Sequence, residues 1–208
     1  MQWSNKNKSL SIENDYEHEW ANPKNYTGNI YNLDDENRTI YLGTFNRILH
    51  PSIRLGFMVA PKYLVQPLIT LQRHSHSFVR PTTQVVMNNF IEKNIIYKHI
   101  RNLVSIAGER KKLFAENFKV IDKRINIDYN KFEKLHLTIK LPKEIDDIKM
   151  SEFLLINGIS TYPLSRCYVS GNKSNGLIIC YAAPRPNSLI ANCKKMSSLI
   201  NEYIKNIN

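Results

Sequence analysis

Two apolar runs close together in the first part of the chain constrain its fold most. The run TIYLGTF spans residues 39–45, the run RLGFMVAP spans residues 54–61, and a more polar turn separates them. Read as strands, both runs carry apolar side chains on both faces, which is typical of a sheet covered on both sides. The run SLSIEN at residues 9–14 reads as a further short strand, and the polar stretch from Ala21 onward reads as a surface loop. The sequence therefore predicts a sheet early in the chain.

A helical segment follows this sheet. Residues 62–121 are helical in character, and from Ile96 onward charged residues fall between apolar ones. The apolar positions recur at mostly helical intervals, which predicts one long helix with a buried stripe. These positions are Ile96, Ile100, Leu103, Ala107, Phe114 and Phe118.

The last part of the chain predicts a second, α+β unit. After a polar stretch at residues 122–132, KLHLTIKLP alternates strictly and predicts a half-buried strand with Leu135, Leu137, Ile139 and Leu141 on one face. A short helix is expected to end at Gly158, a strand to span residues 176–183, and a final helix to begin at about Ser188. We expect two domains, residues 1–121 with the long linking helix and residues 122–208.

Composition narrows the classes of function. The formal net charge is +11, but the basic residues are dispersed, so specific nucleic-acid binding is not expected. The three cysteines show no CxxC spacing, and the six histidines show no metal-ligand spacing, so neither a disulfide frame nor a metal site is predicted. The polar N-terminus and the lack of a long apolar run predict neither a secretory signal nor a membrane span. We expect a cytoplasmic protein.

Four phrases carry a resemblance to a known family. They are SIENDYEHEW, YNLDDENRTIYLGTFNRILHPSIRLGFMVAP, FIEKNIIYKHIRNLVSIAGERKKLF and GISTYPLS, and they occur in this order. The chain resembles, over nearly its whole length, MocR-type proteins, which are aminotransferase class I/II-like chains of fold type I that depend on pyridoxal phosphate. Many of these are fused to a GntR-type winged helix. The resemblance implies an α/β fold: part of a fold-type-I large domain with a mixed sheet, a long helix and a small α+β C-terminal domain.

The resemblance also assigns residues to the ring of the cofactor. Asn14 falls where the family has an aspartate that pairs with the pyridine nitrogen, and Tyr16 falls on a tyrosine that hydrogen-bonds the phenolic oxygen. The aspartate keeps the ring nitrogen protonated, which lets the ring accept electrons. An amide at Asn14 cannot stabilise a pyridinium by charge.

One further assignment concerns the substrate. Proteins of this class commonly have an arginine in the last strand that holds the substrate carboxylate, and this chain has Ile178 there.

The remaining assignments concern the cofactor's phosphate and its covalent link. Thr44 and Arg54 fall on residues that hold the phosphate, Asn46 occupies a usual serine position, and Arg47 falls on the lysine that forms the Schiff base. A lysine amine can lose its proton and attack an aldehyde, whereas a guanidinium stays protonated and cannot. Arg47 can still pair with a phosphate or carboxylate. Covalent binding of pyridoxal phosphate is therefore not expected, and no catalytic residue is assigned.

Three functional hypotheses remain open. Only about ten residues precede the IENDY phrase, where the family has a glycine-rich phosphate cradle and half of the large-domain sheet. The first hypothesis is a truncated, inactive pseudoenzyme. The second is one half of a split aminotransferase, completed by another chain, and the third is a module that binds a phosphate or pyridoxal phosphate without a covalent bond. A homodimer or a complementing chain is the expected partner, and nucleic acid is not expected without a winged helix.

Structural roles alone also account for the same residues. Arg47 and Arg54 can form ordinary ion pairs, and Tyr16 can be a packed core tyrosine. The RHSH segment at residues 73–76 reads as a solvated loop before a helix.

Overall fold

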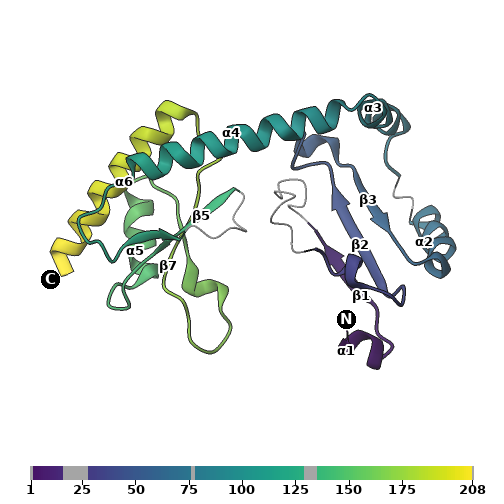
Figure 1. Cartoon of the computed structure of the whole chain (residues 1–208), viewed down its shortest axis with the longest axis horizontal. Coiled ribbons are helices and arrows are strands. Elements are labelled where there is room, and N and C mark those ends of the chain that lie inside the picture. Colours follow the sequence, from purple (N-terminus) through teal and green to yellow (C-terminus); the bar gives the residue numbers. More distant parts are fainter. Residues whose placement is uncertain (1, 16–27, 76–77, 129–134, 208) are drawn as a thin grey trace. The chain divides into compact units, whose positions relative to one another are not determined.

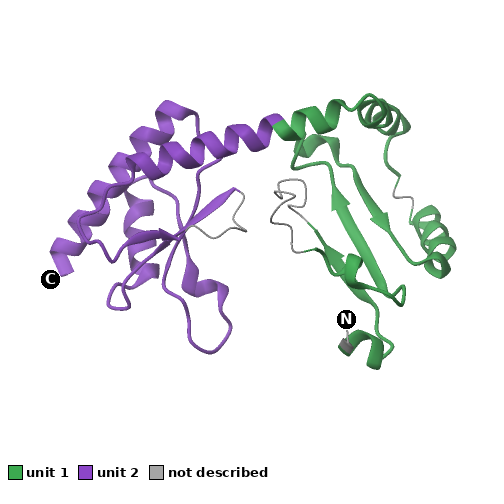
Figure 2. Cartoon of the chain, viewed as in Figure 1, with its two compact units in different colours: residues 1–101 green, residues 102–208 purple. Residues whose placement is uncertain are grey.

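The chain divides into two compact units joined within one long helix. The computed structural model describes residues 2–15, 28–75, 78–128 and 135–207. Unit 1 comprises Met1–Arg101 and unit 2 comprises Asn102–Asn208 (Figure 2). The division falls inside helix α4 (Ile95–Asn117), earlier than the expected boundary at residue 121. The second half of this helix belongs to unit 2 because Phe114 joins the core of that unit.

The sheet of unit 1 has three strands. Helix α1 (Gln2–Lys6) precedes strand β1 (Ser11–Asn14), which runs parallel to β2 (Thr39–Thr44). Strand β2 in turn pairs antiparallel with β3 (Gly56–Val59), so the order is β1-β2-β3 (Figure 1). The expected strands and the mixed sheet are confirmed.

Burial in this sheet is uneven. Thr39, Ile40 and Tyr41 of the middle strand β2 are buried, whereas every residue of β3 is exposed. Met58 of β3 is 50% exposed, although its strand is apolar on both faces. The expectation of cover on both sides is therefore wrong for β3 within the described residues, because no described element buries either face of this strand.

Helices and a short turn complete unit 1. Helices α2 (Lys62–His74) and α3 (Pro81–Glu92) follow β3, and α4 then begins at Ile95, as the apolar stripe predicts. Among the described residues, the single-turn 3-10 helices η3 (Tyr31–Leu33) and η4 (Pro51–Ile53) lie in the connections. Around η4 a small core joins the β2–β3 connection to α3 and α4, and its buried members are Ile48, Leu55, Met87 and Ile96.

Unit 2 is built on an antiparallel sheet. Its strands are β4 (Asn126–Asp128), β5 (His136–Lys140), β6 (Tyr162–Pro163) and β7 (Gly176–Cys180), in the order β4-β5-β7-β6. Strands β5 and β7 confirm two predictions, while β4 and β6 were not predicted. Both unpredicted strands are very short and lie at the edges, so they carry little periodic signal.

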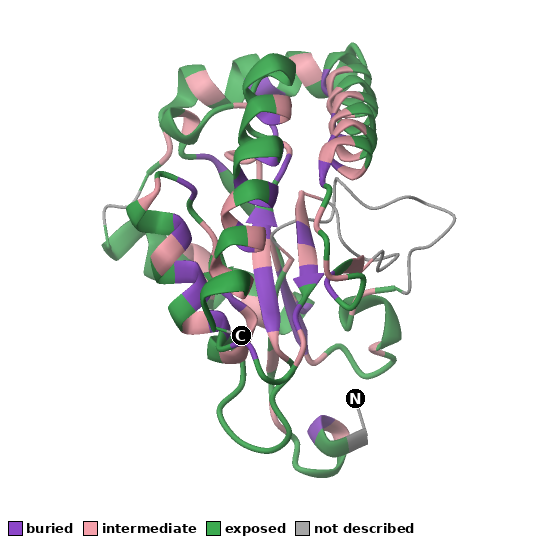
Figure 3. Ribbon diagram, turned by 90° about the vertical axis from the view of Figure 1, so that its left-hand side faces the viewer, coloured by how far each residue is buried: buried purple, intermediate pink, exposed green. Residues whose placement is uncertain are grey.

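Two helices cover the sheet of unit 2. Helix α5 (Asp147–Ile156) ends before Gly158, whose φ of +79° confirms the expected glycine stop. Helix α6 (Pro186–Ile207) begins close to the expected start, and a 3-10 helix, η5 (Leu164–Cys167), precedes β7. Buried residues of the strands and helices are purple in Figure 3. The core of unit 2 contains residues with no exposed surface, among them Leu137, Ile139, Met150, Leu154, Leu177 and Ile200. The predicted small α+β domain is thus confirmed.

Candidate functional site

The predicted site residues of unit 1 that the structure describes lie at one end of its sheet. Asn14 is the last residue of β1 and pairs with Leu42 of β2. Thr44 is the last residue of β2 and pairs with Gly56, the first residue of β3. The carboxyl ends of two parallel strands and the start of the third therefore meet, at the kind of edge where α/β sheets bind ligands.

A turn closed by three hydrogen bonds follows β2. The amide of Phe45 donates to the carbonyl oxygen of Leu55 at 3.0 Å. The amide of Leu55 donates to Asn46 Oδ1 at 3.2 Å, and the amide of Asn46 donates to Thr44 Oγ1 at 3.2 Å. Asn46 thus has a structural role in closing the turn. The closure brings Arg47, the neighbour of Asn46, and Arg54, the neighbour of Leu55, to the same end of the sheet.

Arg54 has an unusual backbone. Its φ of 49° lies in the left-handed region, where it ends η4, and its side chain is exposed. At the other end of η4, His50 Nδ1 accepts a hydrogen bond from the amide of Ser52 at 3.2 Å. A left-handed conformation costs a non-glycine residue roughly 1 kcal/mol. The surrounding hydrogen bonds therefore hold Arg54 in place against its own backbone preference.

The structure describes only part of the ring end of the predicted site, which is the part assigned to the cofactor's ring. Asn14 is exposed, and Tyr16 lies outside the described residues. Asp15, next to Asn14, continues the pairing of β1, because its amide donates to the carbonyl oxygen of Leu42 at 3.1 Å. Its Oδ2 accepts a hydrogen bond from the hydroxyl of Tyr41 at 3.1 Å. Because successive residues of a strand point to opposite faces, the Asp15 carboxylate does not take the place of the Asn14 amide.

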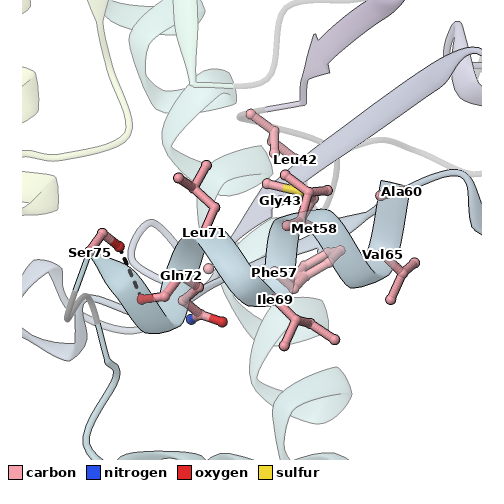
Figure 4. A pocket seen from close by; sticks show the side chains of 12 residues that line it. Leu42, Gly43, Phe57, Met58, Ala60, Val65, Ile69, Leu71, Gln72 and Ser75 are labelled. Carbon is pink, nitrogen blue, oxygen red and sulfur yellow. Dashed lines mark hydrogen bonds between the residues drawn. The ribbon is translucent and has the colours of Figure 1, made fainter. Parts of the chain in front are cut away.

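An apolar groove lies beside this end of the sheet, between β2, β3 and α2 (Figure 4). Its volume is about 700 Å³, and its apolar walls include Leu42, Met58 and Leu71. Gln72 and Ser75 are polar members of the wall, and Ser75 Oγ donates to the carbonyl oxygen of Gln72 at 3.0 Å. None of the described predicted site residues lines the groove, so it is separate from the turn.

In unit 2, the uncharged Ile178 stands where the proteins that the chain resembles commonly have an arginine. Ile178 lies in β7, paired with Thr138 of β5 and Tyr162 of β6. Its aliphatic side chain has no hydrogen to donate to a carboxylate. Unit 2 therefore has no guanidinium at this strand position.

A buried carboxylate of unit 2 carried no recognisable sequence signal. Asp147, the first residue of α5, is 3% exposed. Its Oδ1 accepts from Ser165 Oγ at 2.6 Å, and its Oδ2 accepts from the amides of Ser165 at 2.8 Å and Gly176 at 3.3 Å. These partners satisfy the charge and tie η5 and β7 to α5, so we assign Asp147 a structural role.

The cysteines and histidines fit the sequence expectations only in part. Cys193 is buried, as a small hydrophobic residue should be, but Cys167 and Cys180 are exposed. His74 is the last residue of α2 and is exposed, while His76 lies outside the described residues. Within the described ranges, no group of three or more His, Cys, Asp or Glu residues could hold a metal ion. No helix found in those ranges is long and apolar enough to cross a bilayer.

Comparisons with known sequences agree with this architecture. The chain matches no protein-family model. It is 25% identical to the uncharacterized HTH-type transcriptional regulator YhdI of Bacillus subtilis over 98% of the chain and 44% of the regulator. It is 25% identical to the probable rhizopine catabolism regulatory protein MocR of Rhizobium meliloti, over 91% of the chain and 38% of that protein. An uncharacterized aminotransferase of Saccharolobus solfataricus is 23% identical over 81% of the chain and 42% of its own length.

Solved structures share the fold. The aminotransferase Aro9 from C. Albicans aligns with a TM-score of 0.81 and 21% identity, over 99% of the chain and 51% of that protein. The kynurenine aminotransferase of Pyrococcus horikoshii aligns with a TM-score of 0.77 and 22% identity, over 97% of the chain and 50% of that protein.

These findings define the fold that the chain shares with known proteins. The fold is that of the C-terminal portion of fold-type-I, pyridoxal-phosphate-dependent aminotransferases. The chain's relatives in sequence are MocR-type regulators of the GntR class and aminotransferases, so the resemblance seen in the four phrases is confirmed. The chain spans about two fifths of the length of these curated relatives and about half of the length of the solved structures.

Proposed function

We propose that this chain is a catalytically inactive member of the aminotransferase-like family. The observation that carries the proposal is the presence of Arg47 in the turn after β2, where the resemblance has the Schiff-base lysine. A guanidinium is a permanent cation and cannot act as the amine nucleophile that this chemistry requires. The chain therefore lacks a nucleophile for the covalent step at this position.

The ring end of the site supports the same conclusion. Asn14 presents a neutral, exposed amide at the end of β1, and the neighbouring Asp15 carboxylate is engaged by Tyr41. Pyridoxal phosphate is a stronger electron sink when its ring nitrogen is protonated. The residues at this end therefore do not fit catalytic binding of the cofactor, and we derive no catalytic step through it.

Borohydride trapping tests inactivity directly. The purified chain is mixed with pyridoxal phosphate, reduced with borohydride and mapped by peptide mass spectrometry. We expect no adduct in the peptide that contains residue 47, and we expect the double variant Asn14→Asp, Arg47→Lys to gain one there. An adduct in the same peptide of the unaltered chain would overturn the proposal. Scattered surface lysines that react equally in both proteins provide the internal control.

We propose non-covalent phosphate binding as a second candidate function, because one feature of the turn favours it. The hydrogen bonds among Thr44, Asn46 and Leu55 hold the turn closed, and the exposed Arg54 lies beside this closure. Thr44 Oγ1 accepts from Asn46 and retains its own hydroxyl proton for donation. A guanidinium and a hydroxyl are suitable donors to phosphate oxygens.

Calorimetry with pyridoxal phosphate tests this second candidate. We expect Arg54→Ala to weaken binding by about 1.5 to 3 kcal/mol, the usual cost of losing a hydrogen bond to a charged group. Arg166→Ala is the matched control, because Arg166 is an exposed arginine of η5 in the other unit. Equal affinities for the unaltered chain and Arg54→Ala would remove phosphate binding at this turn.

A further inference from the structure

The turn that carries both arginines is held by a histidine from a distant part of the sequence. His99 lies on α4, and its Nε2 is 2.8 Å from the carbonyl oxygen of Ile48, 51 residues earlier in the chain. A carbonyl oxygen can only accept, so Nε2 carries the hydrogen and donates it. Ile48 directly follows Arg47. The hydrogen bond therefore fixes the backbone next to one of the two cations.

Side-chain packing on the same part of α4 reinforces this bond. Ile48 is 2% exposed and packs in the small core with Leu55 and Ile96. Ile96 lies three residues before His99, so both side chains occupy neighbouring positions on one face of the helix. Leu55 directly follows Arg54. Each arginine is thus adjacent to a residue that belongs to this core.

We infer that His99 is a positioning residue for the Arg47–Arg54 turn and acts through the backbone of Ile48. This inference rests on the proposed phosphate binding for its functional consequence, since His99 itself donates to the protein backbone. Its structural consequence is independent of any ligand. Without the donor, the turn retains its internal hydrogen bonds and its packing against Ile96 but loses its hydrogen bond to α4.

Three variants of His99 distinguish a role as hydrogen-bond donor from a role in side-chain packing alone. In His99→Gln the amide nitrogen is the same number of bonds from Cα as Nε2, so it can donate to the same carbonyl. In His99→Asn the amide nitrogen takes the position of Nδ1 instead and falls short of Ile48. In His99→Leu the volume is largely kept and the donor is lost.

Amide hydrogen exchange of the turn gives the first reading. In His99→Leu and His99→Asn we expect the amides of Phe45 and Leu55 to exchange about fivefold faster, the factor that corresponds to one lost hydrogen bond of ordinary strength. In His99→Gln we expect nearly unaltered protection. The amide of Met87 inside α3 is the control for the opening of unit 1 as a whole, and the amide of Leu177 in β7 is the control for unit 2. Equal protection of the turn in all four proteins, or a failure of Gln to rescue, would overturn the inference.

Titration with pyridoxal phosphate gives the second reading. If the unaltered chain binds the compound, we expect weaker binding in His99→Leu and His99→Asn and recovery in His99→Gln. Unchanged affinity in His99→Leu would overturn the functional part of the inference while phosphate binding stands. No binding by the unaltered chain would remove phosphate binding, and the exchange reading would still decide the positioning role.

Discussion

At the scale of single residues, a few side chains decide which chemistry and which packing this fold permits. Where the resemblance has a lysine nucleophile and an aspartate, this chain has Arg47 and Asn14, and a guanidinium and an amide cannot perform those roles. Asp147 shows the opposite situation, because a buried carboxylate with three hydrogen bonds is satisfied as a structural group. The type of residue and its hydrogen-bond partners together determine whether a polar side chain can take part in a reaction or supports the fold.

Gly176 is required by the close approach of two central strands. A Cβ at this position would lie 2.5 Å from the carbonyl oxygen of Ile139, and backbone in the middle of a sheet cannot easily move. We expect Gly176→Ala to lower the free energy of unfolding by about 1 to 3 kcal/mol, measured by urea denaturation. Gly108→Ala is the control, because nothing lies within 4 Å of its added methyl group on α4. Equal midpoints for the two variants would contradict this account.

Cys193 should make the protein sensitive to alkali. Burial raises the pKa of this thiol from 9.0 to about 12. The folded state therefore keeps the thiol neutral while the unfolded state ionises it, so its contribution to stability is full below pH 9 and is lost as the pH rises toward 12. Burial also raises the pKa of Tyr203, which acts in the same direction.

Urea midpoints measured on either side of pH 9 test this effect. We expect Cys193→Ala to be less stable at neutral pH, because it leaves a cavity, and to lose less stability on the alkaline side. Cys180→Ala removes an exposed thiol and should keep the alkaline loss of the unaltered chain. Tyr203 is present in all three proteins. Parallel alkaline losses in all three would show that Cys193 does not contribute.

At the scale of elements, caps and glycines position the helices that support each unit. Asp146 precedes α5, and its Oδ1 accepts from the amides of Ile148 at 2.9 Å and Lys149 at 3.1 Å. Gly158 lies just beyond the other end of the helix in a left-handed conformation. Both ends of α5 are therefore defined by local chemistry that the sequence displays.

Removal of the N-cap of α5 should be costly for unit 2. We expect Asp146→Ala to reduce the free energy of unfolding by about 0.5 to 2 kcal/mol, because two amides at the start of the helix lose their acceptor. Glu152→Ala, an exposed substitution inside the same helix, is expected to be nearly neutral. Thermal denaturation followed by circular dichroism measures both, and a loss in Glu152→Ala as large as that in Asp146→Ala would argue against the cap.

At the scale of the whole molecule, the two units have cores of very different size. Unit 2 has a continuous core that includes Leu137, Met150 and Ile200, all fully enclosed. Among the described residues, the core of unit 1 around Ile48 and Leu55 has four buried members. Because stability grows with the apolar area that folding buries, unit 1 should open at lower free energy than unit 2.

Native-state hydrogen exchange at increasing urea concentration tests this difference. We expect the amides of Phe45 and Leu55 in unit 1 to exchange through an opening of lower free energy than those of Ile139 and Leu177 in unit 2. The amides of β3 are the least suited as reporters, because this strand is exposed throughout. A single common opening free energy for both units would show that they unfold together.

Most elements could be predicted because their signals are local. The alternation around Ile139, the helical stripe through Phe114 and the glycine stop at Gly158 are all present within short stretches of sequence. Strands β4 and β6 could not be predicted, because three and two residues carry no period. These two strands form because they pair with β5 and β7 in the folded sheet.

The candidate site likewise combines features that are local in the sequence with features that depend on the fold. The chemical groups follow from the sequence alone: a guanidinium at Arg47, an amide at Asn14 and an aliphatic side chain at Ile178, because the chemistry of a side chain belongs to its residue. The contacts follow from the folded chain, in which Asn46 closes the turn and His99 reaches Ile48 from α4. A hydrogen bond between residues 51 positions apart depends on how the intervening strand and helices fold back, and no local pattern encodes that geometry.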